Sequence, residues 1–276
     1  MLVKRSRGAA TALLPALVGL ITMLGGLTSL AEGEHMQTPE CRITVIFNNV
    51  SATERLDAAW GFACVVEGFA RTILFDAGSD GNILLTNMRR LGIDPASIDG
   101  VVLSHLHGDH TGGLEQLLRR NSKVKVFLPR SFPQSFQQRL QRLGADTVTI
   151  NRPVRLFERI HSTGEMGAAI KEQALLLETS KGLVVITGCA HPGVVNIVTQ
   201  ARQYLGGEVY LLMGGFHWMG ASPAEIERRI EALRVLGVKK VAPSHCTGEA
   251  AIHRFRQVWR GDFIAGGCGA VIEIYP

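Results

Sequence analysis

The sequence predicts an α/β fold in which β-sheets are covered by helices. Two observations indicate this. Apolar, strand-like runs alternate with amphipathic helical segments over residues 40–276, and this strand–loop–helix order occurs in both halves. Of all residues, 46% are hydrophobic, which is ample for a sizeable core. The sequence contains no internal repeat, low-complexity tract or interdomain linker, so residues 40–276 are expected to form one domain.

The first half of this domain is expected to supply most of one sheet. Apolar or alternating runs predict strands at 42–47, 62–67, 72–75, 101–103, 123–128 and 147–150. The second and third strands are predicted to form a hairpin around Gly68. Helical spacing predicts helices at 82–91, 114–120 and 135–143, of which the first and last end at Gly92 and Gly144. Residues 151–172 are expected to hold hairpin strands and a substrate-facing loop.

The second half of the domain has the same strand–loop–helix order. Runs of β-branched and apolar residues predict strands at 183–186, 208–212, 238–241 and 270–274. Helices are predicted at 194–205, 223–236 and 249–259. The middle helix begins with a capping box, Ser222 to Glu225, and has Pro223 at its first position.

The stretch 101–114, VVLSHLHGDHTGGL, carries the most informative chemistry. Its apolar start predicts the end of a buried strand, and Gly112-Gly113 break the chain before the next helix. Between them lie four metal-capable side chains within six residues: His105, His107, Asp109 and His110. Imidazole with carboxylate is a usual ligand set of zinc. This stretch therefore predicts a metal site.

The pattern of these four residues after an apolar strand resembles the signature of the metallo-β-lactamase superfamily. Further features follow in the family's order: Asp76 in FDAG, His191 in TGCAHPG and His245 in SHCTG, each after a predicted strand. TGCAHPGVVNI, GGFH and SHCTG together resemble the branch of dihydropterin ribofuranosylaminobenzene-phosphate synthases and related metal-dependent hydrolases. The resemblance covers about residues 42–276. It implies an αββα sandwich, two mixed sheets packed face to face with helices outside.

The resemblance also implies two metal positions. The first would be held by His105, His107 and His191, and the second by Asp109, His110 and His245. Asp76 is expected to orient a histidine through its ring N–H. The family's bridging Asp is expected between the last two histidines, but that loop reads MGGFHWMG and has no carboxylate. We expect His217 to lie there as a ligand or near the metal.

The missing acid leaves the number of metals at one or two. Zn²⁺ is the expected cofactor, with Mn²⁺ or Fe as alternatives. Asp109 is expected to be a ligand in a two-metal site, or the catalytic base where the second position is empty.

Five cysteines without a C-x-x-C pair predict no disulfide framework. Cys189 and Cys246 each lie within two residues of a predicted metal histidine. Each is either a zinc ligand or, more often, a small buried hydrophobe.

The reaction that the resemblance implies is hydrolysis by a metal-activated water. Glycines around His191, and Thr247 with Gly248, precede helices whose backbone N–H groups favour anions, which predicts an anionic small molecule as substrate. The resemblance to the branch implies that this molecule is phosphorylated or heterocyclic. Two alternatives stay open. One is the pterin-condensing synthase of a methanopterin-type pathway, a transferase; the other is a non-catalytic metal- or ligand-binding protein, which the missing acid favours.

Residues 1–31 resemble a signal peptide or an N-terminal membrane anchor. A basic start, Lys4-Arg5-Ser6-Arg7, precedes an apolar stretch that ends in the small-x-small site Ser29-Leu30-Ala31. The stretch approaches the roughly 20 residues that span a bilayer. The protein is expected to be exported, periplasmic or membrane-anchored, or cytoplasmic if Met36 is the true start. An exported protein is a poor host for cytosolic cofactor synthesis, which favours the hydrolase.

The charge balance gives no indication of nucleic-acid binding. The net charge is +5, and residues 1–31 carry three of the basic residues and no acid, which leaves +2 for the remainder. No run of Lys and Arg with interleaved aromatics occurs. The expected partner is a small anionic molecule, with membrane contact only through an uncleaved N-terminal segment; no oligomeric state is predicted.

Overall fold

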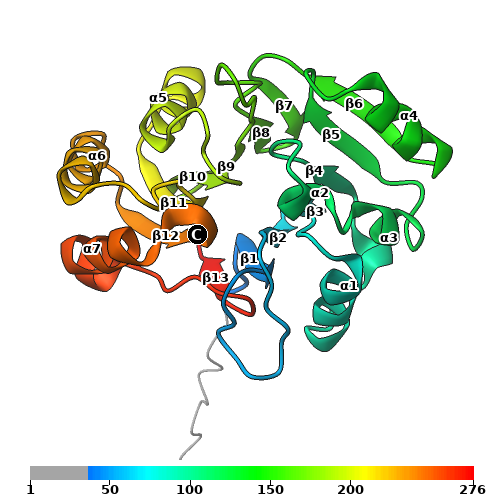
Figure 1. Ribbon diagram of the computed structural model, residues 1–276, viewed down its shortest axis with the longest axis horizontal. Helices are drawn as coiled ribbons and strands as arrows, with labels where there is room; N and C mark the ends of the chain where they lie inside the picture. Colours follow the sequence, from blue (N-terminus) through cyan, green and yellow to red (C-terminus); the bar gives the residue numbers. More distant parts are fainter. Residues whose placement is uncertain (1–36) are drawn as a thin grey trace, which may run out of the picture. The chain divides into compact units, whose positions relative to one another are not determined.

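The computed structural model describes residues 37–276, so the predicted leader at 1–31 lies outside the described residues. Residues 37–276 form two β-sheets that pack face to face and are covered by helices (Figure 1). Helices α1, α3 and α4 lie along one flank, and α5, α6 and α7 lie along the other. This is the predicted αββα sandwich, and the prediction is confirmed. Among residues 37–276, no helix combines the length and the apolar character needed to cross a bilayer.

The first sheet has the strand order β13-β1-β2-β3-β4-β5-β6. Its strands are β1 Cys41–Phe47, β2 Ala63–Gly68, β3 Arg71–Phe75, β4 Gly100–Val102, β5 Lys125–Pro129, β6 Asp146–Ile150 and β13 Val271–Ile274. Strands β3 to β6 run parallel, so crossovers must join them, and these contain α1 Gly81–Arg90, α3 Leu114–Leu118 and α4 Gln134–Arg142. The predicted hairpin around Gly68 is present: Gly68 pairs with Arg71 across a turn made by Phe69 and Ala70, both in the left-handed region.

The second sheet has the order β12-β11-β10-β9-β8-β7. Its strands are β7 Val154–Phe157, β8 Ile160–Ser162, β9 Leu175–Thr179, β10 Gly182–Thr187, β11 Val209–Gly215 and β12 Lys240–Ser244. Parallel strands β10, β11 and β12 alternate with α5 Val194–Leu205 and α6 Pro223–Val235, and α7 Glu249–Trp259 follows. The predicted capping box is present, because Ser222 and Glu225 bond each other's backbone N–H groups. The hairpin expected within 151–172 is β7–β8, whereas β9 was not predicted.

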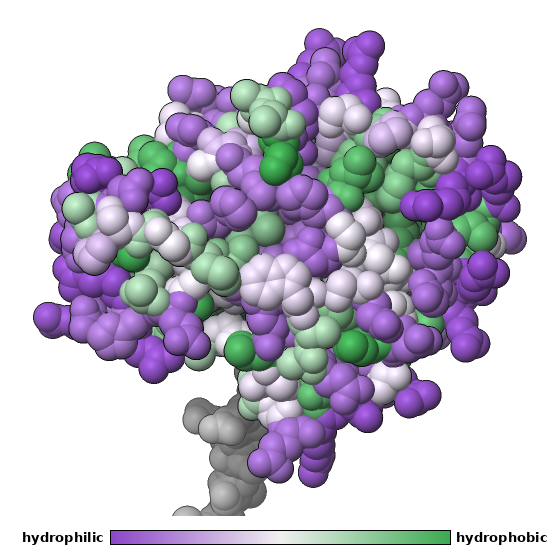
Figure 2. All heavy atoms as spheres, viewed as in Figure 1, coloured by the Kyte–Doolittle hydropathy of each residue, from purple (hydrophilic) through white to green (hydrophobic). Residues whose placement is uncertain are grey.

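Three hydrophobic layers hold the sandwich together. One lies between the two sheets and contains Phe75 and Ile186. A second joins the first sheet to its helices, and a third joins the second sheet to α5, α6 and α7. Sheets buried on both faces require apolar side chains on both, which explains the continuous apolar runs in the sequence. Figure 2 shows hydrophilic side chains over the outer helices on both flanks.

The metal-loop stretch after β4 is more regular than the sequence predicted. It contains a short helix, α2 Gly108–Thr111, before Gly112 and Gly113. Three short 3₁₀ turns complete the fold, at Pro95–Ser97, His245–Thr247 and Arg260–Asp262. Loops after parallel strands emerge at the same edge of a sheet, so the segments that follow β3, β4, β10, β11 and β12 meet there.

Candidate metal centre

The first group of metal-capable atoms joins the ends of β4 and β10. The ring nitrogens of His105, His107 and His191 lie within 4.8 Å of one another. His105 Nε2 and His107 Nδ1 are 3.1 Å apart. Corners of a tetrahedron around zinc, with bonds of about 2.0–2.1 Å, lie about 3.3 Å apart. The separation therefore fits two ligands of one cation.

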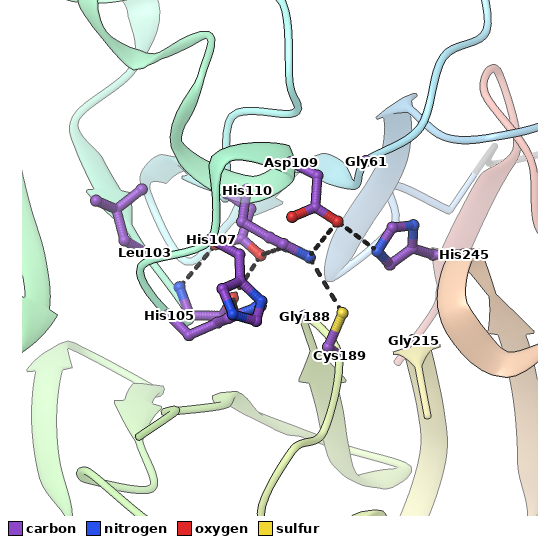
Figure 3. A network of polar contacts seen from close by, with 12 residues as sticks. Gly61, Leu103, His105, His107, Asp109, His110, Gly188, Cys189, Gly215 and His245 are labelled. Carbon is purple, nitrogen blue, oxygen red and sulfur yellow. Dashed lines mark hydrogen bonds and ion pairs between the residues drawn. The ribbon is translucent and has the colours of Figure 1, made fainter. Parts of the chain in front are cut away.

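The second group contains Asp109, His110, His245 and Cys189, again with ligand atoms within 4.8 Å of one another (Figure 3). Asp109 Oδ2 lies 3.3 Å from His245 Nε2 and 3.5 Å from His110 Nε2. Cys189 Sγ lies 3.3 Å from His110 Nε2.

Asp76 lies behind both groups and is fully buried. Its Oδ1 accepts the Ser104 N–H, and its Oδ2 accepts the Ser104 hydroxyl and His110 Nδ1–H, each at 2.7 Å. Because the Ser104 hydroxyl donates to Asp76, its oxygen accepts from His105 Nδ1–H at 2.9 Å. Both histidines thus carry their proton on Nδ1, and their Nε2 lone pairs face the groups just described.

Asn49, which follows β1, fixes His245 in the same way. Its Oδ1 accepts the Gly61 N–H at 3.1 Å and lies 2.9 Å from His245 Nδ1. Its amide nitrogen donates to the His245 carbonyl. These two backbone contacts establish which atom of the Asn49 amide is the oxygen. Since that oxygen can only accept, His245 Nδ1 must be the donor, and His245 Nε2 carries the lone pair. The sequence did not predict Asn49, because a single Asn after a strand has no distinguishing pattern.

Two of these nitrogens have no hydrogen-bond partner within residues 37–276, although His245 Nε2 faces Asp109 Oδ2. His191 Nε2 and His245 Nε2 are buried and make no hydrogen bond. Burial lowers the pKa of His105 and His245, and together with His217 it lowers that of His191 to about 4, so these rings are neutral at pH 7. Neutral, buried and unpartnered imidazole nitrogens fit a divalent cation, which would satisfy them.

Glu172 holds a loop of the candidate centre in place, and the sequence did not reveal it. It is fully buried just before β9, and it accepts N–H groups from Gly188, Cys189, Ala190 and His191 at 2.8–3.1 Å. Burial raises the pKa of its carboxyl, and the backbone N–H groups oppose that rise. The loop expected to bind a substrate anion therefore already binds the chain's own carboxylate. No local signal distinguishes Glu172, since its contacts lie 16–19 residues away in sequence.

The remaining predicted site residues are His217, Cys246 and Thr247, and they differ in their distance from the two metal positions. His217 forms a third group with Cys189 and Cys246, within 4.8 Å, and its ring centroid lies 4.5 Å from that of His191. Its role as a ligand stays a prediction. Thr247 is buried and structural: its hydroxyl donates to the Ser244 carbonyl and accepts the Phe216 N–H.

The strand end that lacks the bridging acid has no room for one at its last residue. A Cβ on Gly215 would lie 2.4 Å from the Gly188 carbonyl oxygen and 2.7 Å from Cys246 Sγ. Backbone strain gathers around this edge, since Asp76, His217 and His245 all have φ between 52° and 57°. Such non-glycine conformations persist where the surroundings hold them, and they concentrate at functional sites.

Two cavities flank the centre. One of about 320 Å³ is lined by His191, His217 and Arg229, next to the N-terminus of α5. The other, of about 420 Å³, is lined by Trp60, His245 and Arg256. Trp60 is 49% exposed and its ring centroid lies 4.9 Å from that of His245. Each cavity thus joins a histidine of the centre to an arginine.

Comparisons with known proteins agree with this geometry. Residues 61–245 match the model of the metallo-β-lactamase superfamily. The 7,8-dihydropterin-6-methyl-4-(β-D-ribofuranosyl)-aminobenzene-5′-phosphate synthase of Methanocaldococcus jannaschii is 32% identical over an alignment of 251 positions, which covers 75% of this chain and 85% of that protein.

Two solved structures have the same fold. Tm1679, described as a metal-dependent hydrolase of the β-lactamase superfamily, superposes with a TM-score of 0.73 and 26% identity, over 86% of this chain and all of that one. The metallo-β-lactamase fold protein YhfI from Bacillus subtilis gives a TM-score of 0.63 with 15% identity over the same shares. With two sheets, converging histidines and a match over two thirds of its length, the chain belongs to the metallo-β-lactamase superfamily of metal-dependent enzymes.

Proposed function

We propose that the protein is a metal-dependent hydrolase that acts on an anionic small molecule. The observation that carries the proposal is the convergence of imidazole nitrogens and Asp109 Oδ2 in two adjacent groups, with two of the nitrogens buried and without a hydrogen-bond partner. His105, His107 and His191 would hold one cation, and Asp109, His110 and His245 the other. Bound zinc would supply Lewis-acid activation of water and of the substrate oxygen.

The chain's own residues would seat the substrate. The two cavities open on either side of the histidines, so a molecule lying across the centre would place its reacting bond beside them. Arg229 or Arg256 would pair with its anionic group. Asp76 and Asn49 would keep the histidine lone pairs aimed inward during turnover, because their hydrogen bonds hold the rings' other nitrogens protonated.

The 32% identical relative favours a second candidate, the condensing synthase for which that protein is named. A pterin is a flat heterocycle, and the exposed Trp60 ring beside His245 offers a stacking surface for one. Export through residues 1–31, which we retain as part of the proposal, argues for the hydrolase instead.

The two candidates are separated by assaying the full chain, loaded with zinc or manganese, on both reactions. One panel contains a phosphodiester, a phosphomonoester and a lactone; the parallel assay follows condensation to the product in the relative's name. We expect chelator-sensitive turnover of an anionic ester, abolished in His107→Ala. Condensation without ester turnover would replace the hydrolase with the synthase, and no turnover by the fully loaded protein would favour a binding protein.

A further inference from the structure

The group around Asp109 has three ligands of the expected kind and lacks the acid that resemblance to the family led us to expect. Gly215 ends β11 at this point, and the Gly188 carbonyl and Cys246 sulfur leave no space for a side chain on it. Structural zinc sites are almost always four-coordinate, whereas catalytic sites have three protein ligands and a position for water or substrate; in the family's pattern the bridging acid adds one more protein ligand. The question is which side chain already present occupies the fourth position.

Cys189 is placed to do so. Its sulfur lies within 4.8 Å of the ligand atoms of Asp109, His110 and His245, and 3.3 Å from His110 Nε2. A zinc–sulfur bond of about 2.3 Å places sulfur about 3.6 Å from a neighbouring nitrogen ligand. Figure 3 shows the Cys189 side chain pointing toward the His110 ring, next to Asp109 and His245.

The backbone that presents Cys189 is rigidly held. Its N–H donates to Glu172 Oε1 at 3.0 Å, between the similar bonds of Gly188 and Ala190. Cys189 is 4% exposed, so water competes little with a cation for its sulfur. A sulfur held in this way needs little reorganisation to bind a cation.

We infer that the Cys189 thiolate is the fourth ligand of the cation held by Asp109, His110 and His245, in place of the missing bridging carboxylate. This inference rests on the proposed metal centre. On binding, the thiol proton passes to solvent and sulfur donates a lone pair to the cation, with no change in oxidation state. A thiolate selects a softer cation, so this position should prefer Zn²⁺ to Mn²⁺.

Cys246 provides the matched control. It is as buried as Cys189 and lies close to it. It does not belong to the set of ligand atoms formed by Asp109, His110, His245 and Cys189. Its thiol donates to the Cys189 carbonyl at 3.7 Å. It therefore has a backbone partner of its own, and its loss should leave the metal position intact.

The experiment titrates the stripped full chain with Co²⁺ under a non-thiol reductant and records absorbance together with metal content. We expect two equivalents and a near-ultraviolet sulfur-to-cobalt charge-transfer band that grows with one of them. Cys189→Ser should lose the band and bind that equivalent at least about tenfold more weakly, whereas Cys246→Ser should keep both.

Two equivalents without a charge-transfer band would overturn the inference and leave the metal centre standing. A band that survives in Cys189→Ser and disappears in Cys246→Ser would assign the ligand to Cys246 instead. No bound cobalt in the wild-type chain would overturn this inference and the proposed function together.

Discussion

Glu172 carries a buried carboxylate whose two oxygens accept four backbone N–H groups from the loop that presents Cys189 and His191. It binds no metal in the proposed centre, yet it determines where two of the proposed ligands lie. A loop with several parallel N–H groups is an anion site, and here the anion comes from the same chain.

Replacing Glu172 with Gln should therefore weaken both the fold and the centre. An amide group would turn a donor toward at least one of these N–H groups, and an unsatisfied buried donor costs about 1–3 kcal/mol. We expect a lower unfolding temperature and weaker zinc binding, measured by calorimetry and by zinc titration. The exposed Glu158→Gln is the control; equal behaviour of the two variants would contradict the role given to Glu172.

Asp76 acts on the centre through its hydrogen bonds and its charge, without being one of the proposed ligands. In Asp76→Asn, the amide oxygen would take the place of Oδ1, because it must still accept the Ser104 N–H. The amide nitrogen would then face His110 Nδ1–H. Two donors cannot bond each other, and His110 would be driven to protonate Nε2, which faces the proposed cation. We expect zinc affinity at the Asp109 position to fall about 10- to 100-fold, measured by competition with a chelating dye. The exposed Asp94→Asn should change nothing; a similar loss there would point to a general effect of charge.

Helix α6 brings an arginine to the cavity beside His191. Arg229 lines that cavity, with its guanidinium 5.6 Å from the Trp218 ring centroid, whereas its neighbour Arg228 is exposed and lies outside the lining. If an anionic group binds there, Arg229→Gln should raise KM about tenfold or more and change kcat little, because a hydrogen bond to a charged group is worth about 1.5–3 kcal/mol.

Steady-state kinetics on whichever ester the enzyme turns over would measure this, with Arg228→Gln as the matched control. Unchanged KM in Arg229→Gln, together with raised KM in Arg256→Gln, would move the anionic group to the cavity beside Trp60.

Local patterns predicted most elements, because apolar periodicity, glycine ends and the Ser222 capping box act within a few residues. Strand β9 was missed, since its run LLLET has neither alternation nor a turn signal before it. At the site, the histidines were found because they follow strands whose ends must meet. The sequence did not predict Glu172, Asn49 and Trp60. Their partners lie far away in sequence, and only the packing of the two sheets brings them together.

The two sheets are also joined at the end away from the metal centre. Glu40 precedes β1 of the first sheet, and its carboxylate bonds Arg159, between β7 and β8, and Ser180, between β9 and β10. The Arg159 guanidinium also lies 4.6 Å from the ring centroid of Phe69, in the β2–β3 turn. Metal loops follow the other ends of these strands, so this link contributes to stability and not to the chemistry.

The Glu40 link should give stability a defined pH dependence. Partial burial opposes ionisation, but the Ser180 and Arg159 bonds outweigh it and hold the pKa of Glu40 below its ordinary 4.5. A lowered folded-state pKa means that the contribution is complete above pH 4.5 and is lost as pH falls through the folded value. We expect Glu40→Gln to cost about 1–2 kcal/mol at pH 7, less than for a fully buried charged bond because Arg159 is partly exposed.

Urea unfolding of wild type and Glu40→Gln between pH 3 and pH 8 would test this, with the exposed Glu54→Gln as the control. The difference in unfolding free energy should narrow below pH 4.5, while metal content at pH 7 stays unchanged. A difference that is constant with pH would show that Glu40 acts through packing and not through its charge. Loss of metal in Glu40→Gln would show instead that the two ends of the sandwich are coupled. The histidines lie at the far ends of the strands, so whole sheets would have to move relative to each other to disturb them.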